Sequence, residues 1–319
     1  MPAPIDSITP TAASPSSDDA RRRGKPEAGV NLDGGVFLLQ WATGGLLFMW
    51  VTTRRRELGL GYGWLLRSVF AVLALGGSVV LVVEGLDRPA QVIAFAASLL
   101  TAAVAIVVLG LAVVRRGAGV SGDSARRDRR RARVSAMLGR DATTGVSAAA
   151  RSIPKELDPR LDLVAPAVGA VGLLVAAQFS GGPIVLAAAR LLVGAAFLGC
   201  VTDAMLLGHW YLVQPGLPRD AVKQLVQLTA VIWPVEVAVM LWPTGMVQVL
   251  NGTVDDGWKG ILGWTWFACA IATIALVGLT WAALKERAYS AVMAATGLLY
   301  LAILTGFGTD LLARAVLRP

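Results

Sequence analysis

The chain alternates between long apolar runs and short polar segments. Each run has about 20 residues, the length that an α-helix needs to cross the roughly 30 Å hydrocarbon core of a bilayer. The expected spans are 34–52, 64–84, 90–114, 161–180, 183–208, 220–242, 259–283 and 287–312. We therefore predict an all-α fold, a polytopic integral membrane helical bundle with about eight transmembrane helices.

The polar segments divide the chain into four parts. Residues 1–33 contain no apolar run and are rich in Pro, Ala, Ser, Asp and Arg, which is typical of a disordered tail. A three-helix membrane segment, 34–114, is followed by a basic loop, 115–160, and then by a five-helix membrane segment, 161–319. No part of the first membrane segment visibly matches the second, so the sequence does not indicate an inverted repeat.

The composition agrees with a membrane protein. Of the 319 residues, 55% are hydrophobic and 16% are charged, and the mean hydropathy is +0.64. A soluble domain carries about 25% charged residues. The abundance of Ala, Gly, Arg and Val suits a bacterial protein, and we expect a plasma (inner) membrane location.

The net charge of +8 is concentrated in the basic loop, where 115–160 holds twelve Lys and Arg and five Asp and Glu, a net charge of +7. Basic residues near span ends favour the cytoplasm. This rule places the basic loop and Arg54–Arg56 in the cytoplasm, and both termini then lie outside. The arginines at 21–23 in the tail would prefer the opposite orientation.

The centre of the basic loop is expected to contact anionic lipid head groups, at about 1 kcal/mol for each basic residue. These residues are Arg126, Arg127, Arg129, Arg130 and Arg131. No aromatic residue occurs in 115–160, so a nucleic-acid base would find no stacking partner there. We expect lipid partners, or partner membrane proteins, and no nucleic acid.

Two ionisable residues on neighbouring spans lie at the same depth. Arg190 and Glu236 are seven and six residues from the outer ends of their spans, which places both about 10 Å below the outer face. Charges inside a membrane usually face a partner or a wet cavity. We expect an intramembrane ion pair that serves either to fix helix register or as a gate. Arg67, one turn into its span, is expected to extend to the interface.

A candidate polar cavity lies nearer the cytoplasm, between the spans 183–208 and 220–242. Its residues are Asp203, His209, Gln224 and Gln227. At about 100° per residue, Asp203 is turned roughly 220° away from Arg190. Asp203 is therefore expected to face another helix or a cavity, which makes it the better functional candidate of the two.

The only histidine, His209, lies in the turn 208–220 with Trp210 and Tyr211. It is interpreted as part of an interfacial aromatic belt, as a proton-responsive group or as a haem ligand. One histidine cannot supply both axial positions, so we predict no cofactor and keep haem ligation by His209 as an alternative. Cys200 and Cys269 lie in apolar runs without further ligands, and we predict no metal site.

Small residues recur at four-residue spacing in two of the spans. Ala165 and Gly169 form one such pair, and Ala195 and Gly199 form the other. This spacing lets helix backbones approach closely, and we expect it to serve bundle packing.

No serine nucleophile elbow and no phosphate-binding loop occurs in the sequence, so an enzyme is not indicated. One interpretation is a carrier of a small solute or ion, in which Asp203 and Glu236 respond to protons or cations. The alternative is a non-catalytic accessory or assembly subunit of a larger membrane complex, which docks through the 208–220 turn and the basic loop. A lipid-modifying enzyme comes third, because clustered carboxylates or histidines are missing.

Overall fold

The structure is a computed structural model that describes residues 33–138, 156–214, 217–243, 245–254 and 256–317. Its α-helices are α2 (Gly34–Thr53), α3 (Leu60–Glu84), α4 (Pro89–Val114), α5 (Ser121–Met137), α6 (Val164–Ala176), α7 (Ile184–Val213), α8 (Asp220–Leu241), α9 (Gly245–Leu250), α10 (Ile261–Lys285) and α11 (Tyr289–Leu317). Two short 3-10 helices, η1 (Arg115–Ala118) and η2 (Pro159–Leu163), join them. Eight of the described helical segments are long and apolar enough to cross a membrane. The chain is a multi-pass, all-α membrane protein, as predicted.

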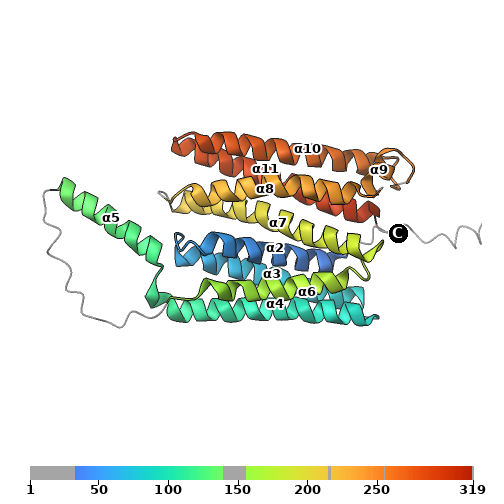
Figure 1. Ribbon diagram of the computed structural model, residues 1–319, viewed down its shortest axis with the longest axis horizontal. Coiled ribbons are helices and arrows are strands. Elements are labelled where there is room, and N and C mark those ends of the chain that lie inside the picture. The colour runs from blue at the N-terminus through green and yellow to red at the C-terminus, as the bar shows by residue number, and fades with distance from the viewer. Residues whose placement is uncertain (1–32, 139–155, 215–216, 244, 255, 318–319) are drawn as a thin grey trace, which may run out of the picture. The chain divides into compact units, whose positions relative to one another are not determined.

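The spanning helices form two consecutive groups of four (Figure 1). In the first group, α2 packs on α3, α3 on α4, α4 on α6 and α6 on α2. In the second group, α7 packs on α8, α8 on α10, α10 on α11 and α11 on α7. The two groups meet mainly where α2 packs on α7. The fourth span therefore packs with the three that precede the basic loop, whereas the sequence had divided the spans three and five.

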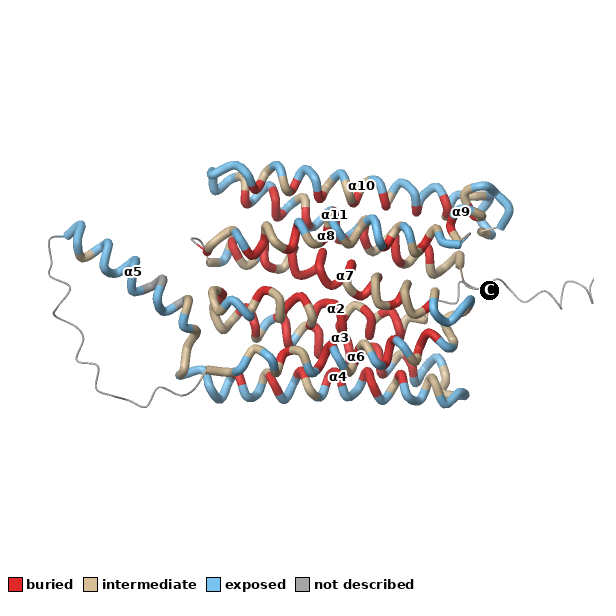
Figure 2. The backbone as a smooth tube through the Cα atoms, viewed as in Figure 1, coloured by how far each residue is buried: buried red, intermediate tan, exposed pale blue. Residues whose placement is uncertain are grey.

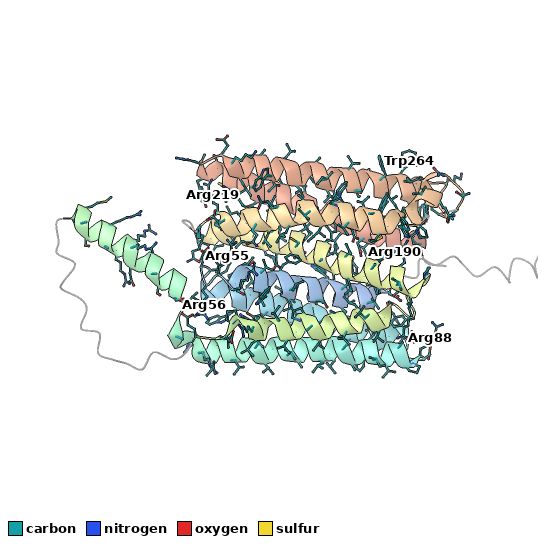
Figure 3. The ribbon with its side chains drawn as sticks, viewed as in Figure 1. Arg55, Arg56, Arg88, Arg190, Arg219 and Trp264 are labelled. Atoms are coloured by element: carbon teal, nitrogen blue, oxygen red, sulfur yellow. The ribbon has the colours of Figure 1, made fainter. Side chains whose placement is uncertain are left out.

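The up-and-down order of the helices gives the bundle two distinct ends. We call the basic end the one that holds Thr53, Leu60, Val213, Asp220 and Lys285, and the opposite end the one that holds Gly34, Glu84, Ile184, Leu241 and Leu317. Figure 3 shows Arg55, Arg56 and Arg219 at the basic end and Arg88 at the opposite end. The orientation of these ends in a membrane remains a prediction.

Burial follows this arrangement, and α2 and α7 are the helices with the most buried residues (Figure 2). Two thirds of the apolar window of α2 is buried, compared with 28% for α10. The outward faces of α4 and α10 carry exposed Val, Leu, Ile and Trp side chains. Exposed apolar surface on a membrane bundle faces lipid, so the polar groups of α2 and α7 are held away from it.

Small residues allow α2 and α7 to touch through their backbones. A Cβ atom added to Gly199 would lie 2.1 Å from the carbonyl carbon of Gly44, and one added to Gly44 would lie 1.7 Å from the Ala195 oxygen. Gly169 lies equally close to Thr43 of α2. The close packing expected from the Ala195–Gly199 spacing is therefore confirmed.

Replacing Gly199 with Ala is expected to lower the free energy of unfolding by about 1–3 kcal/mol, because the added methyl group must push α2 away from α7. The measurement is denaturant unfolding in detergent. Gly278→Ala on α10 is the control, since its Cβ would meet no atom within 4 Å. Equal stability of the two variants would contradict this close packing.

Some segments differ from the sequence-based expectation. The fifth span continues to Val213, so His209 lies on α7 and not in a turn, because no Pro or Gly interrupts the helix between 209 and 213. The basic loop contains η1 and α5, and the loop 243–258 contains α9. The predicted tail lies outside the described residues apart from Asp33, as do 139–155 of the basic loop.

Asp256 organises the turn that leads into α10. Its carboxylate accepts hydrogen bonds from the backbone N–H groups of Trp258, Gly260, Leu262 and Gly263, at 2.8–3.4 Å. Desolvation acts to raise the pKa of Asp256, but these four donors outweigh it and hold the pKa below its usual range. The ionised form therefore stabilises the start of α10.

Acidification is expected to loosen this turn. Because the folded-state pKa of Asp256 is depressed, its contribution is fully present above the unfolded Asp pKa of about 3.9 and is lost as the pH falls through the folded value. The protection factors of the Leu262 and Gly263 amides, which are corrected for the slower intrinsic exchange at low pH, should fall over that range. In Asp256→Asn the exchange should already be faster at neutral pH, whereas Asp128→Asn on α5 should leave it unchanged.

Candidate functional site

A buried polar cluster joins α2 to α11 at the boundary between the two helix groups. The Gln40 side-chain amide donates to the Asp310 carboxylate at 3.2 Å. Arg314, one turn further along α11, donates from Nε to the other oxygen of Asp310 at 2.7 Å. Asp310 and Gln40 are completely buried. The pairing with Arg314 compensates the charge of Asp310 inside the protein.

Glu236 on α8 is the second acid of this cluster, and unlike Asp310 it has no direct partner for its charge in the described part of the chain. It is completely buried, and neither carboxylate oxygen has a hydrogen-bond partner among the described residues. The charged groups that act on it are Asp310, Arg314 and Arg190. Glu236 thus lies within the electrostatic reach of two arginines without a direct contact to either.

No ion pair joins Arg190 to Glu236 in the described part of the chain. Arg190 instead donates from Nε to the Val239 carbonyl and from Nη2 to the Trp242 carbonyl, both at 2.9 Å. The last carbonyl groups of a helix have no partner within the helix, so the guanidinium caps the end of α8. Arg190 and Glu236 lie at similar depths, and the Arg190 side chain does reach α8. Its guanidinium donates to the Val239 and Trp242 carbonyls, which lie nearer the end of α8 than Glu236 does.

The polar residues form one layer near the opposite end. Each is five to seven residues from its helix end: Gln40 from Gly34, Arg190 from Ile184, Glu236 from Leu241 and Asp310 from Leu317. At 1.5 Å per residue the backbone positions of these residues are about 8–11 Å deep. The guanidinium of Arg190 reaches from this depth to the carbonyl groups at the end of α8. Gly194 on α7 makes room for it, because a Cβ there would lie 2.3 Å from Gln40 Nε2 and 2.8 Å from Asp310 Oδ1.

A pocket leads to this layer from the opposite end of the bundle. Its polar lining includes Arg190, Arg314, Asp33 and Ser180, together with the apolar side chains of Leu191 and Met240. Asp33 and Ser180 lie just outside the ends of α2 and α6, so the pocket opens at the helix ends. Figure 3 labels Arg190 where α7 and α8 run side by side near this end. The charged side chains that line the pocket are therefore Arg190, Arg314 and Asp33, whereas Glu236 and Asp310 do not line it.

Asp203 forms a second buried site closer to the basic end. Asp203 is completely buried, and both of its oxygens lack a hydrogen-bond partner among the described residues. Tyr62 on α3 is also completely buried, and its hydroxyl lies within electrostatic range of Asp203. Because Tyr62 belongs to the first helix group and Asp203 to the second, this site also lies at their boundary. It is about 14 Å along α7 from Gly194.

The other residues of the predicted polar cavity are placed apart from Asp203. His209 is exposed, and its Nδ1 lies 3.2 Å from the Tyr300 hydroxyl of α11. Gln227 is exposed, and Gln224 is half-buried on α8. In the described part of the chain no hydrogen bond joins these residues to Asp203, so the four do not form one hydrogen-bonded group.

The described residues include part of the segment predicted to contact lipid, and they can also be searched for metal ligands. The described residues contain no group of three or more His, Cys, Asp or Glu side chains that could hold a metal ion. Of the arginines expected at lipid head groups, Arg129, Arg130 and Arg131 are exposed on α5. The side chains of Arg126 and Arg127 lie outside the described part.

A buried ion pair at the basic end was not anticipated. Arg67 does not extend to the interface but donates from Nε and Nη2 to both oxygens of Asp162 in η2, at 2.9 and 2.7 Å. Both side chains are less than 10% exposed. Asp162 follows the long basic loop, so nothing in the spacing of the sequence pairs it with Arg67.

Asp310 and Gln40 were likewise missed as members of the site. One signal was present, because Asp310 and Arg314 are four residues apart and such a pair shares one helix face. Gln40 gave no comparable signal, since a single amide in an apolar run has no spacing to identify its partner.

Comparison with protein-family models, with curated proteins and with solved structures finds no match for this chain.

Proposed function

We propose that this protein is a proton-linked carrier that moves a small polar solute across a plasma membrane. The observation that carries this proposal is the pair of completely buried acids, Asp203 and Glu236, which have no hydrogen-bond donor among the described residues. Asp203 lies where the two helix groups meet, toward the basic end, and Glu236 lies on α8 near the opposite end, beside the Asp310–Gln40 cluster that joins α11 to α2.

The energetics of burial support this role. An ionised carboxylate without water or donors costs several kcal/mol, and the cost disappears when the group binds a proton or a cation. Asp310 avoids the cost through Arg314 and Gln40. Asp203 and Glu236 have no such hydrogen bonds among the described residues, and only the more distant Arg190 and Arg314 offset the charge of Glu236. Reversible protonation gives both groups a function that accounts for their position.

The two-group architecture supports movement of a solute. In many carriers the site lies between two helix groups that rock against each other, so that it opens to either side in turn. Here the α2–α7 boundary is closely packed at Gly44 and Gly199, between the two acidic sites. This contact serves as the pivot, and the basic end faces the cytoplasm under the positive-inside rule.

The exposed arginines of α5 complete the proposal on the cytoplasmic side. Arg129, Arg130 and Arg131 bind anionic lipid heads electrostatically, at about 1 kcal/mol each. This contact anchors the basic segment to the membrane surface and takes no part in transport.

The test uses the full chain reconstituted into vesicles that contain a pH-sensitive dye. A panel of small anionic, neutral and cationic solutes is added outside, and the internal pH is followed. At least one solute should cause a pH change that is absent in Glu236→Gln and Asp203→Asn. Asp220→Asn, an exposed acid at the start of α8, is the matched control and should transport normally.

The accessory-subunit alternative predicts a different outcome. No solute would then move the internal pH, and purification in mild detergent would retain a stoichiometric partner protein. Together these two results would overturn the carrier proposal, as would unchanged solute-driven pH changes in both acid variants.

A further inference from the structure

We propose that the transported solute is a small monovalent anion that binds between Arg190 and Arg314 and is loaded together with the proton on Glu236. This inference rests on the proposed carrier function and adds the chemical class of the solute. It concerns the pocket at the opposite end of the bundle, which both arginines line.

Both guanidinium groups keep hydrogen-bond donors that an anion can use. Arg190 uses Nε and Nη2 for the carbonyls of α8, and Nη1 donates to no other described residue. Arg314 uses Nε for Asp310, and neither of its terminal nitrogens donates within the described part of the chain. The planar donor edge of an arginine suits carboxylate-like oxygens and is permanently charged.

The charges of the layer favour an anion only when a proton is present. Within the layer, Arg190 and Arg314 contribute two positive charges, while Asp310 and an ionised Glu236 contribute two negative charges; Asp33 lines the same pocket but is not part of the layer. A proton on Glu236 removes one negative charge and leaves Arg190 without a compensating carboxylate in the layer. A monovalent anion then restores neutrality, so the proton and the anion are loaded together without net charge.

The surroundings of Glu236 contain few other groups that could alter this balance. The groups that act on it are Arg190 from α7 and Asp310 and Arg314 from α11. Packed against α8 on its other sides, α9 carries no ionisable residue, and α10 carries Cys269 and, at the basic end, Lys285. The facing residue from α2 is the uncharged Gln40, and Asp33 lines the mouth of the pocket.

The volume of the pocket suits a solute of a few atoms. Its cavity volume is about 50 Å³, and a bound water requires roughly 10–15 Å³ on this measure. The space therefore matches about four water-sized positions. Nitrate, formate and acetate fit this volume. The tetrahedral dianions sulfate and hydrogen phosphate are larger and bring a second charge that the layer does not balance.

Coupling between the proton and the anion is reciprocal. An anion at Arg190 favours the proton on Glu236, and that proton increases anion affinity by the same factor. Anion affinity should therefore be greatest at low pH and fall by up to about tenfold per pH unit once Glu236 ionises.

The experiment measures binding of nitrate, formate and acetate to the purified full chain in a neutral detergent, by thermal shift at constant ionic strength. Proton uptake is followed in weakly buffered solution with a pH indicator. At a pH where Glu236 is ionised in the anion-free protein, we expect about one proton taken up per anion bound. Glu236→Gln should bind the same anions with no proton uptake and with an affinity that does not change with pH, because the amide imitates the protonated acid.

Arginine variants test the binding groups. Arg190→Gln should lose anion binding, and Arg314→Lys, which keeps the charge but not the planar fork, should weaken it more than about tenfold. Arg219→Gln is the matched control, because Arg219 also donates to backbone carbonyls at a helix end but lies at the basic end of the bundle. If Arg190→Gln does not fold, the wild-type proton uptake and the Glu236→Gln result decide the question.

Failure of this inference is distinguishable from failure of the carrier proposal. Solute-driven pH changes that depend on Glu236 but are caused only by neutral or cationic solutes would overturn the anion site and leave the carrier intact. If the wild-type chain binds anions without proton uptake at every pH, including where anion affinity falls with rising pH, the inference is overturned. Anion binding that persists in Arg190→Gln would also overturn it.

Discussion

Replacing Glu236 with Met is expected to raise the free energy of unfolding by about 1–3 kcal/mol while abolishing transport. The gain arises because Met fills a similar volume without a buried polar group that lacks partners. The loss of transport arises because Met cannot bind a proton. Thermal unfolding in detergent measures the first effect, and the internal pH of reconstituted vesicles measures the second.

The other acid of the same layer supplies the control for this prediction. Asp310→Asn should lower stability, because it removes the charge that Arg314 and Gln40 hold in place. Two acids in one layer should therefore change stability in opposite directions. A destabilised Glu236→Met variant would show that Glu236 has a structural role, and normal transport by that variant would refute its role as the proton-binding group.

The number and position of the spans could be predicted from the sequence because hydrocarbon thickness imposes a length on every apolar run. For example, the span predicted at 90–114 corresponds to α4, Pro89–Val114. Helix ends were less predictable where no Pro or Gly marks them, as at the C-terminal end of α7. The bilayer requires a minimum length of helix but does not prevent a helix from continuing beyond it.

The grouping of the helices was not predictable in the same way. A long loop separates α4 from α6 in the sequence, yet the two helices pack together. Loop length restricts neighbours only when the loop is short, so the basic loop carried no information about packing. The boundary between the groups, where the candidate site lies, therefore could not be located from the sequence.

The candidate site was predictable as far as depth and charge could identify it. Glu236 and Arg190 were identified because ionisable residues are costly in apolar runs, and both belong to the observed layer. Their expected direct pairing did not account for the carbonyl groups at the end of α8, which compete for the guanidinium. Equal depth on two helices does not determine which acceptor a long side chain reaches.

Replacing Arg67 with Met is expected to lower the free energy of unfolding by about 3–5 kcal/mol, which is the largest stability loss predicted for this protein. The substitution removes both hydrogen bonds to Asp162 and leaves a buried carboxylate without its counter-ion. Denaturant unfolding of the full chain in detergent measures the change. The loss of stability should be greatest above the pH at which Asp162, without Arg67, takes up a proton. Only the ionised carboxylate carries the desolvation cost.

A double variant and an exposed ion pair show whether this loss of stability comes from the unpaired charge of Asp162. Arg67→Met combined with Asp162→Leu should recover most of the lost stability, since apolar side chains of similar volume replace a buried pair at little cost.

Arg56→Gln breaks a more exposed ion pair, in which Arg56 Nη1 lies 2.7 Å from Glu156 Oε2, and should cost no more than about 1 kcal/mol. If the double variant is no more stable than Arg67→Met alone, the loss comes from packing around Arg67. In that case the buried ion pair would position the start of α6, and its charges would contribute little to the stability.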